Sequence, residues 1–413
     1  MIEVELPWSA WFQESTCRIR FPEEWDVHVA TLPQRPSLST SEIDAVIRQP
    51  VAGPKLADVV KSAKRIAIAV EDLTRPAPTA EIVPVLLDQL LACGVRPEQV
   101  WLFIATGAHR AATRIDAERK LSTRAVRDFE VHYHSCFCNL VHIGDTRHGT
   151  PLWINRRFAE CDVKITIGSV TPHDYAGFGG GAKTAAVGLA GLDTLDATHG
   201  RCIDEETNFT GSLDRTSFRD DLEEMADRVG LSFSINAVVG PRRELVHLTS
   251  GGYRQSHAAA CQFADDHYRA EIHRDADLVV LNAYPKDTDL LQVMMALNVG
   301  FFARPEMVKP DGLVLVTGSC PEGAGIHYLA GRDMRGEYRL KDAQMMGREN
   351  AIYSDNLTAH EHSIFMPPSM QLLGTWEEVV DWMKPRLPAR TRVTVLTHAT
   401  LQLPQIAIPQ CMP

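Results

Sequence analysis

Short runs of apolar residues recur along the chain and predict buried strands. They lie at residues 66–70, 100–105, 163–170, 231–239, 276–281, 313–317 and 392–397. Between several of these runs the apolar residues follow helical spacing, as over 79–93, where Gly94 ends the pattern. Strands that alternate with helices predict mainly parallel sheets with crossover helices, so the expected fold class is α/β. Because the pattern restarts near residue 270, we expect two domains, 1–270 and 271–413.

The composition argues against several classes of protein. A chain of 413 residues with 45% hydrophobic and 23% charged residues is typical of globular proteins with more than one core. Its net charge is −11 and it has no basic cluster, which argues against partners such as nucleic acid or an anionic membrane. We also expect neither a leader peptide nor a membrane span, because residues 1–8 show no basic and apolar leader regions and no apolar run is long enough to cross a membrane. Nine scattered cysteines indicate free thiols, and we therefore expect a cytoplasmic protein.

Three segments that directly follow predicted strands are rich in residues capable of chemistry. They are Glu-Asp-Leu-Thr-Arg-Pro-Ala-Pro at 71–78, Ala-Thr-Gly-Ala-His-Arg at 105–110, and Thr-Pro-His-Asp-Tyr-Ala-Gly-Phe-Gly-Gly-Gly-Ala-Lys-Thr at 171–184. Sites in α/β proteins form where strands end at their carboxyl edge. We therefore expect these segments to contribute to one site.

The third segment contains a glycine-rich loop, Gly179, Gly180 and Gly181, followed by Lys183 and a predicted helix. Successive glycines can leave their N–H groups bare, and such a loop can surround an anion. The loop nearly matches a P-loop, but Ala182 replaces the glycine required before the lysine, and six residues separate the motif from the strand. A loop that serves only tight packing is an alternative, although the functional residue types on both sides argue against it.

Taken together, these motifs resemble the lactate racemase family. That family has an Asp-x-Thr-Arg-Pro segment, a Gly-x-His-Arg segment, a Pro-His…Gly-Gly-Ala-Lys run, and a histidine sixteen residues beyond the lysine. Here the matching segments are 72–76, 107–110 and 172–183, followed by His199, and the resemblance extends over about 60–300.

The resemblance implies a nickel-pincer nucleotide, a pyridinium-3-thioamide-5-thiocarboxylic acid mononucleotide that carries nickel. Lys183 would hold it covalently and His199 would ligate the metal, which suits a planar site with sulfur, carbon and nitrogen ligands. Asp72 and Thr74 would line the nucleotide together with the glycine-rich loop. In this reading the first domain is catalytic, and the second closes an interdomain cleft that holds the active site.

The family's activity implies an isomerase, a racemase or epimerase that acts on a 2-hydroxy acid by hydride transfer. Inversion at C2 also removes a proton from the hydroxyl group, on opposite sides for the two enantiomers. Two bases are needed, and histidine is suited to this role. His109 and His173 correspond to the family's pair of acid/base histidines. Arg75 would bind the substrate carboxylate, and Tyr284 and Gln292 would line the pocket.

Two positions depart from the family pattern. Met295 stands where the family commonly has a substrate-binding lysine, and residues 341–349 lack an expected tryptophan. We therefore expect a substrate larger than lactate. Enzymes that make the cofactor are implied partners, and the sequence leaves the oligomeric state open, a homo-oligomer included. The alternative functions are a non-catalytic cofactor carrier or nucleotide-binding protein of the same fold and, third, a P-loop phosphotransferase.

A second cluster of metal-binding residue types occurs at 132–138. If this segment were a strand, His132, His134, Cys136 and Cys138 would share one face. Zinc favours such ligands. A half-buried strand with inert thiols explains the same pattern.

Overall fold

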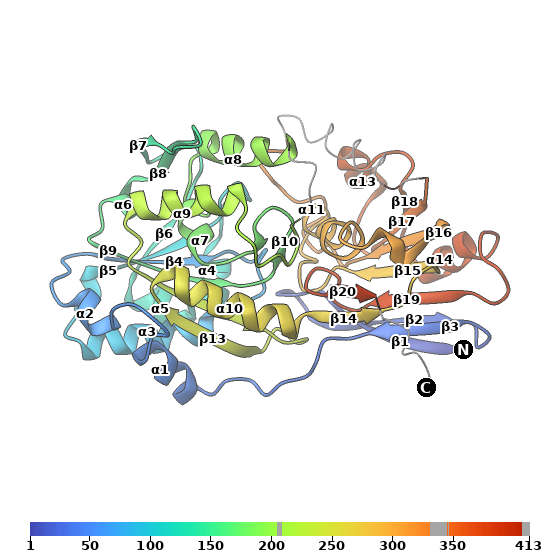
Figure 1. The fold of residues 1–413 in the computed structure, drawn as a ribbon, viewed down its shortest axis with the longest axis horizontal. Coiled ribbons are helices and arrows are strands. Elements are labelled where there is room, and N and C mark those ends of the chain that lie inside the picture. Colours follow the sequence, from blue (N-terminus) through green and yellow to red (C-terminus); the bar gives the residue numbers. More distant parts are fainter. Residues whose placement is uncertain (205–208, 331–344, 346, 407–413) are drawn as a thin grey trace. The chain divides into compact units, whose positions relative to one another are not determined.

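The computed structural model describes all residues except 205–208, 331–344, 346 and 407–413 (Figure 1). The chain forms two compact units. Unit 1 contains Met1–Pro33, His267–Ile326 and Ala330–Pro413, and unit 2 contains Gln34–Asp266 and His327–Leu329. The predicted boundary near residue 270 lies close to His267. The first 33 residues, however, group with the C-terminal half, because strand β3 pairs with strand β19 of that half.

Unit 2 is built on a six-stranded sheet in the order β13-β12-β9-β4-β5-β6. The strands are β4 (Ile66–Glu71), β5 (Val100–Ala105), β6 (Glu130–Tyr133), β9 (Val163–Ser169), β12 (Phe233–Val239) and β13 (Leu245–Gly251). All neighbours are parallel except β12 and β13. Every residue of β4, β9 and β12 is buried, which explains their nearly continuous apolar sequences.

Helices cover both faces of this sheet (Figure 1). They are α1 (Thr40–Arg48), α2 (Leu56–Val60), α3 (Thr79–Ala92), α4 (Arg114–Leu121), α5 (Thr123–Asp128), α6 (Arg156–Ala159), α7 (Ala182–Ala186), α8 (Leu192–Asp204), α9 (Ser217–Val229) and α10 (Tyr253–His267). Two short antiparallel pairs complete the unit, β7 (Leu140–Asp145) with β8 (Pro151–Asn155), and β10 (Pro172–His173) with β11 (Gly177–Phe178). Helices α7 and α9 pack in one apolar cluster with alternate residues of β4 and β5, including Ala67, Ala69 and Phe103.

Unit 1 contains a second six-stranded sheet, which is parallel throughout and has the order β18-β17-β16-β15-β19-β3. The strands are β3 (Asp26–Ala30), β15 (Ala276–Asn282), β16 (Val308–Thr317), β17 (Glu349–Tyr353), β18 (Gln371–Leu373) and β19 (Arg392–Leu396). Around it lie β1 (Ile2–Trp8), β2 (Ser15–Phe21), β14 (Arg269–Ile272), β20 (Leu403–Ile406), α11 (Leu290–Val293), α13 (Ala359–Phe365) and α14 (Trp376–Met383).

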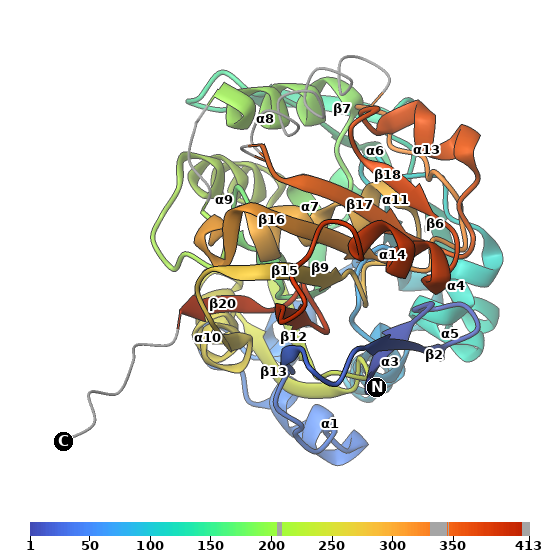
Figure 2. The same cartoon turned by 90° about the vertical axis from the view of Figure 1, so that its right-hand side faces the viewer.

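Alternation along the strands gives this second sheet two apolar faces. Leu278 and Val280 of β15 pack with the β1–β2 hairpin and α14. Val279 and Leu281 pack with the segment that begins at α11. Figure 2 shows β15, β16 and β17 of this sheet side by side.

The structure confirms the predicted α/β class, with mainly parallel sheets in both units. A strand lies at each of the seven predicted positions, and α3 follows the predicted helical pattern within one residue. Among the described residues, no helix is long and apolar enough to cross a membrane.

Candidate functional site

Three neighbouring strands of unit 2 bring the predicted segments together. In the sheet, β4 lies between β9 and β5, and the three strands end at Glu71, Ser169 and Ala105. The segments 71–78, 105–110 and 171–184 therefore leave the same edge of the sheet, as expected for parallel strands.

The first two segments are joined by a buried carboxylate and an imidazole. Nδ1 of His109 lies 2.7 Å from Oδ2 of Asp72, and the Thr74 hydroxyl donates to Oδ1 of Asp72 at 2.6 Å. The Arg75 guanidinium donates to the Thr74 hydroxyl oxygen at 2.9 Å. Burial alone would raise the pKa of Asp72, but His109, Arg75 and the Thr74 hydrogen bond together hold it well below its usual range. Asp72 is therefore an anion that fixes the proton of His109 on Nδ1 and leaves Nε2 as the basic nitrogen.

A buried ion pair supports the segment that carries Asp72. Glu71 accepts hydrogen bonds from the backbone N–H and the hydroxyl of Ser169, at 2.6 and 2.8 Å, and from the N–H of Ala77. Its other partner is Lys120, whose side chain is fully buried, with a separation of 3.2 Å. Hydrogen bonds between Glu71 and Ser169 therefore connect the ends of β4 and β9 next to the segment that carries Asp72.

The third segment places His173 beside Lys183. The β10–β11 pair sets His173 opposite Gly177, and Nζ of Lys183 contacts Nε2 of His173. The backbone N–H groups of Tyr175 and Ala176 donate to Nδ1 of His173, at 3.2 and 3.3 Å. The same nitrogen also lies 3.1 Å from Oδ1 of the Asp174 carboxylate.

His199 lies on α8 and packs near the same aromatic ring as His173. The Phe218 ring centroid is 6.2 Å from that of His173, with the rings nearly parallel, and 6.0 Å from that of His199. Nδ1 of His199 donates to the Leu195 carbonyl oxygen at 2.8 Å, one helical turn away. This hydrogen bond assigns the lone pair to Nε2.

The glycine-rich loop is packed more tightly than the sequence suggests. The Gly179 N–H donates to the Thr171 carbonyl at 2.8 Å, and the Gly181 N–H donates to Oδ1 of Asn236 at 3.0 Å. The expectation of three bare N–H groups is therefore wrong for Gly179 and Gly181, because groups within the protein already accept from them. A Cβ atom at Gly180 would lie 2.9 Å from the Ser169 carbonyl oxygen, so tight packing accounts for part of the glycine content.

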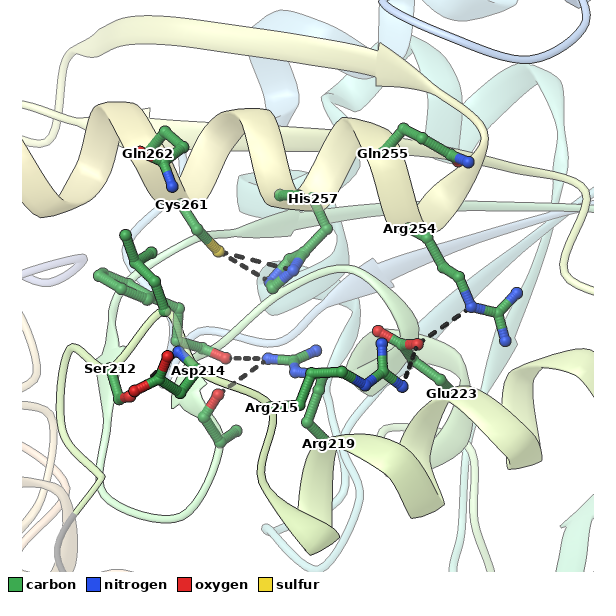
Figure 3. A pocket seen from close by; sticks show the side chains of 14 residues that line it. Ser212, Asp214, Arg215, Arg219, Glu223, Arg254, Gln255, His257, Cys261 and Gln262 are labelled. Carbon is green, nitrogen blue, oxygen red and sulfur yellow. Dashed lines mark hydrogen bonds and ion pairs between the residues drawn. The ribbon is translucent and has the colours of Figure 1, made fainter.

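Arg219 and His257 donate hydrogen bonds to the backbone carbonyl groups of this loop. Both residues line a pocket of about 340 Å³ (Figure 3). The buried Arg219 guanidinium donates to the carbonyl oxygens of Ala176, at 3.2 Å, and Phe178. Nε2 of His257 donates to the Gly179 carbonyl oxygen at 2.7 Å. Burial and the Arg219 charge lower the pKa of His257 to about 3, so this ring stays neutral. The loop's carbonyl groups are thereby directed toward α9 and α10.

Comparisons with known proteins show what the chain resembles. A family model for the lactate racemase N-terminal domain matches residues 12–211. The chain is 28% identical over 296 residues to the lactate racemase of Thermoanaerobacterium thermosaccharolyticum, which covers 70% of this chain and 68% of that enzyme. It is 27% identical over 381 residues to the lactate racemase of Lactiplantibacillus plantarum, covering 86% and 88%.

The chain is therefore similar to lactate racemases over most of its length, and residues 12–211 match the family model. Solved structures show the same fold. The lactate racemase apoprotein from T. thermosaccharolyticum aligns with a TM-score of 0.78 and 21% identity, over 98% of this chain and 100% of that one. A protein from Thermotoga maritima aligns with a TM-score of 0.68 and 16% identity, over 91% and 100%.

The residues of this chain suit the cofactor that the resemblance implies. A histidine ligates a metal as a neutral imidazole, and the hydrogen-bond partner of its second nitrogen fixes which nitrogen ligates. The His199–Leu195 hydrogen bond provides such a partner. Lys183 contributes a primary amine next to His173, which suits covalent attachment. His199 and Lys183 would therefore hold the group.

The other predicted substrate residues lie in unit 1. Tyr284 and Gln292 are buried, Gln292 on α11, and Met295 is partly buried with its sulfur 4.0 Å from Nδ2 of Asn298. Their roles in binding substrate stay predictions. Within 341–349, residues 341–344 and 346 fall outside the described part of the chain.

The idea of a metal-binding strand face at 132–138 is wrong, because β6 ends at Tyr133. His134 is instead buried, and its Nε2 donates to the Ala190 carbonyl oxygen at 2.9 Å. Cys138 is exposed, while Cys136 packs in an apolar cluster.

Sequence reasoning missed two side chains of the site. Phe218 lies in α9, where nothing in its periodicity distinguishes it from an ordinary core residue. His327 comes from a distant segment, yet its ring centroid lies 5.2 Å from that of His109. Burial, followed by its neighbours His109, His199 and Arg75, lowers the pKa of His327 well below its usual range.

The packing of Gly181 leads to a stability prediction with a matched control. Gly181 has φ +58°, and an added Cβ would lie 2.8 Å from the His257 ring, whereas Gly94 has φ +83° and open space. Gly94→Ala should cost about 1 kcal/mol, the usual penalty for a left-handed backbone. Gly181→Ala should cost a further 1–3 kcal/mol or so, since it also overpacks the core. Urea unfolding measures both, and equal losses would contradict the described packing.

Proposed function

We propose that the protein is a racemase or epimerase that interconverts the stereoisomers of a 2-hydroxy acid with a lysine-tethered nickel-pincer nucleotide. The curated relatives are lactate racemases, which supports the isomerase class. The observation that carries the proposal is the pairing of His109 with the Asp72 carboxylate at 2.7 Å, at the same sheet edge as His173. A non-catalytic carrier would need Lys183 and His199 but would have no use for this pair.

The surroundings of the two histidines support their roles as the acid/base pair. Asp72 holds the His109 proton on Nδ1, so Nε2 of His109 can accept the proton of the substrate hydroxyl. His173 lies beside the Asp174 carboxylate and the Lys183 amine, and it would exchange the hydroxyl proton of the opposite enantiomer.

The remaining tasks fall to the cofactor and to the cationic side chains. When bound, the nickel-pincer nucleotide would supply the hydride-transfer chemistry at C2. Lys183 would hold it and His199 would ligate its metal. The guanidinium group of Arg75, positioned by the Thr74 hydroxyl, would bind the substrate carboxylate as a fork.

The identity of residue 295 predicts the substrate class. Met295 provides no charge where the family has a lysine, and the loss of a charge-assisted hydrogen bond weakens the binding of a small carboxylate about ten- to a hundredfold. A larger 2-hydroxy acid recovers this loss through contacts of its side chain. The test compares kcat/KM of the cofactor-loaded enzyme for lactate, 2-hydroxyisocaproate, 3-phenyllactate and gluconate.

We expect lactate to be the poorest of these substrates. Met295→Lys should raise kcat/KM for lactate about tenfold, by restoring a charge-assisted contact. The control Met295→Leu keeps the apolar character and should leave the order of substrates unchanged. If lactate were the best substrate of the wild-type enzyme, the substrate prediction would fail while the racemase assignment would stand.

A further inference from the structure

His327 reaches the site on a short segment that is anchored independently of its side chain. The Tyr328 N–H donates to the Ala108 carbonyl oxygen at 2.7 Å, and His327 forms an isolated antiparallel bridge with His109. Leu329 packs with Ala108 in an apolar cluster. The Tyr328 ring lies edge-on to Phe137, with a centroid separation of 4.7 Å. Backbone and neighbours therefore fix the segment, and none of these contacts requires an imidazole at position 327.

One nitrogen of the His327 imidazole, Nδ1, is buried without a hydrogen-bond partner among the described residues. Buried polar groups in proteins nearly always have a partner, and an exception calls for an explanation such as a ligand. An apolar side chain at this position would avoid the cost of the unpaired nitrogen.

The surroundings of His327 indicate which ligand would supply the missing partner. Its ring centroid lies 5.2 Å from that of His109, at a tilt of 59°. Its other charged neighbours include Asp72 and Arg75, which belong to the same site. Two imidazoles at this separation can hydrogen-bond one oxygen atom between them.

We propose that His327 is a substrate-binding residue whose Nδ1–H donates to the oxygen on C2 of the 2-hydroxy acid, the same oxygen whose proton His109 exchanges. This inference rests on the proposed function and adds to it a third imidazole. A neutral imidazole can donate to this oxygen in both the hydroxy acid and the keto acid, so it holds the oxygen while His109 takes or returns the proton. Substrates lacking this oxygen gain nothing from His327.

The test measures binding rather than turnover, with matched pairs of ligands. The cofactor-loaded wild type, His327→Leu and His327→Gln are titrated calorimetrically with lactate and propanoate, and with 3-phenyllactate and 3-phenylpropanoate. We expect His327→Leu to weaken binding of the two hydroxy acids about tenfold and to leave the deoxy acids unaffected. His327→Gln, which keeps a donor, should restore most of the affinity. Thermal unfolding should show that His327→Leu is as stable as the wild type or more so.

Each other outcome counts against a stated claim. Equal weakening for hydroxy and deoxy acids, or a lower melting temperature together with weaker binding, would show a structural role and overturn the inference. Unchanged affinity for the hydroxy acids in His327→Leu would also overturn it. A wild-type enzyme that binds hydroxy and deoxy acids equally well would instead overturn the proposed function.

Discussion

Lys183→Ala should abolish covalent loading of the cofactor, because alanine provides no amine for the tether. The side chain of Lys183 contacts His173 beside the glycine-rich loop, so the amine lies next to one of the two proposed acid/base residues. Intact-protein mass spectrometry of protein coexpressed with the cofactor-making enzymes measures the added mass. The wild type should carry the adduct, and Lys183→Ala should carry none.

Two control variants separate attachment from folding and from metal binding. Lys183→Arg keeps the positive charge but offers a guanidinium in place of the amine, so it should also lack the adduct. His199→Ala should keep the adduct and lose nickel, since His199 would ligate the metal without forming the tether. An intact adduct on Lys183→Ala would show that another group forms the covalent link.

His109→Ala should lower racemisation of the loaded enzyme by about 10²–10⁴-fold, the usual range for loss of a general acid or base. Asp72→Asn should lower the racemisation rate by a similar factor. An amide lacks the negative charge that holds the His109 proton on Nδ1, and it can present its NH2 group to Nδ1 in place of an oxygen. Both effects should appear mainly in kcat. The mass of the adduct should not change in either variant.

The surface of unit 2 provides a matched control for this pair. His142 also lies 2.8 Å from a carboxylate, that of Asp145, but its side chain is 40% exposed. His142→Ala should leave the rate unchanged. If His109→Ala retained the wild-type rate, the assignment of His109 as a base would be wrong.

The strands could be predicted from the sequence because most of them are buried on both sides. Such strands appear as continuous apolar runs, as at β4 and β12, and their ends are marked by the first polar residues. The edge strand β3 has only one buried residue, and it pairs with β19 more than 360 residues later along the chain. Its membership in unit 1 depends on this distant pairing, which local periodicity does not reveal.

The candidate site was predictable to the extent that its residues follow strand ends. Asp72, His109 and His173 occupy such positions, and the motifs around them add the family resemblance. Packing across distant segments could not be predicted in this way. The Gly181 N–H donates to the side chain of Asn236, and His327 forms a bridge with His109. These contacts join segments far apart in the sequence, so the residue spacing within one segment does not predict them.

The central claim is most directly tested by following the label of a 2-hydroxy acid deuterated at C2. The enzyme, coexpressed with the cofactor-making enzymes, is incubated with one enantiomer of 3-phenyllactate. Chiral chromatography with mass detection then follows the product. We predict that the opposite enantiomer forms and keeps most of its deuterium, because the hydrogen on C2 is carried as a hydride and is not released to water. Product that has lost its deuterium completely to water would show proton abstraction at C2 and contradict the account.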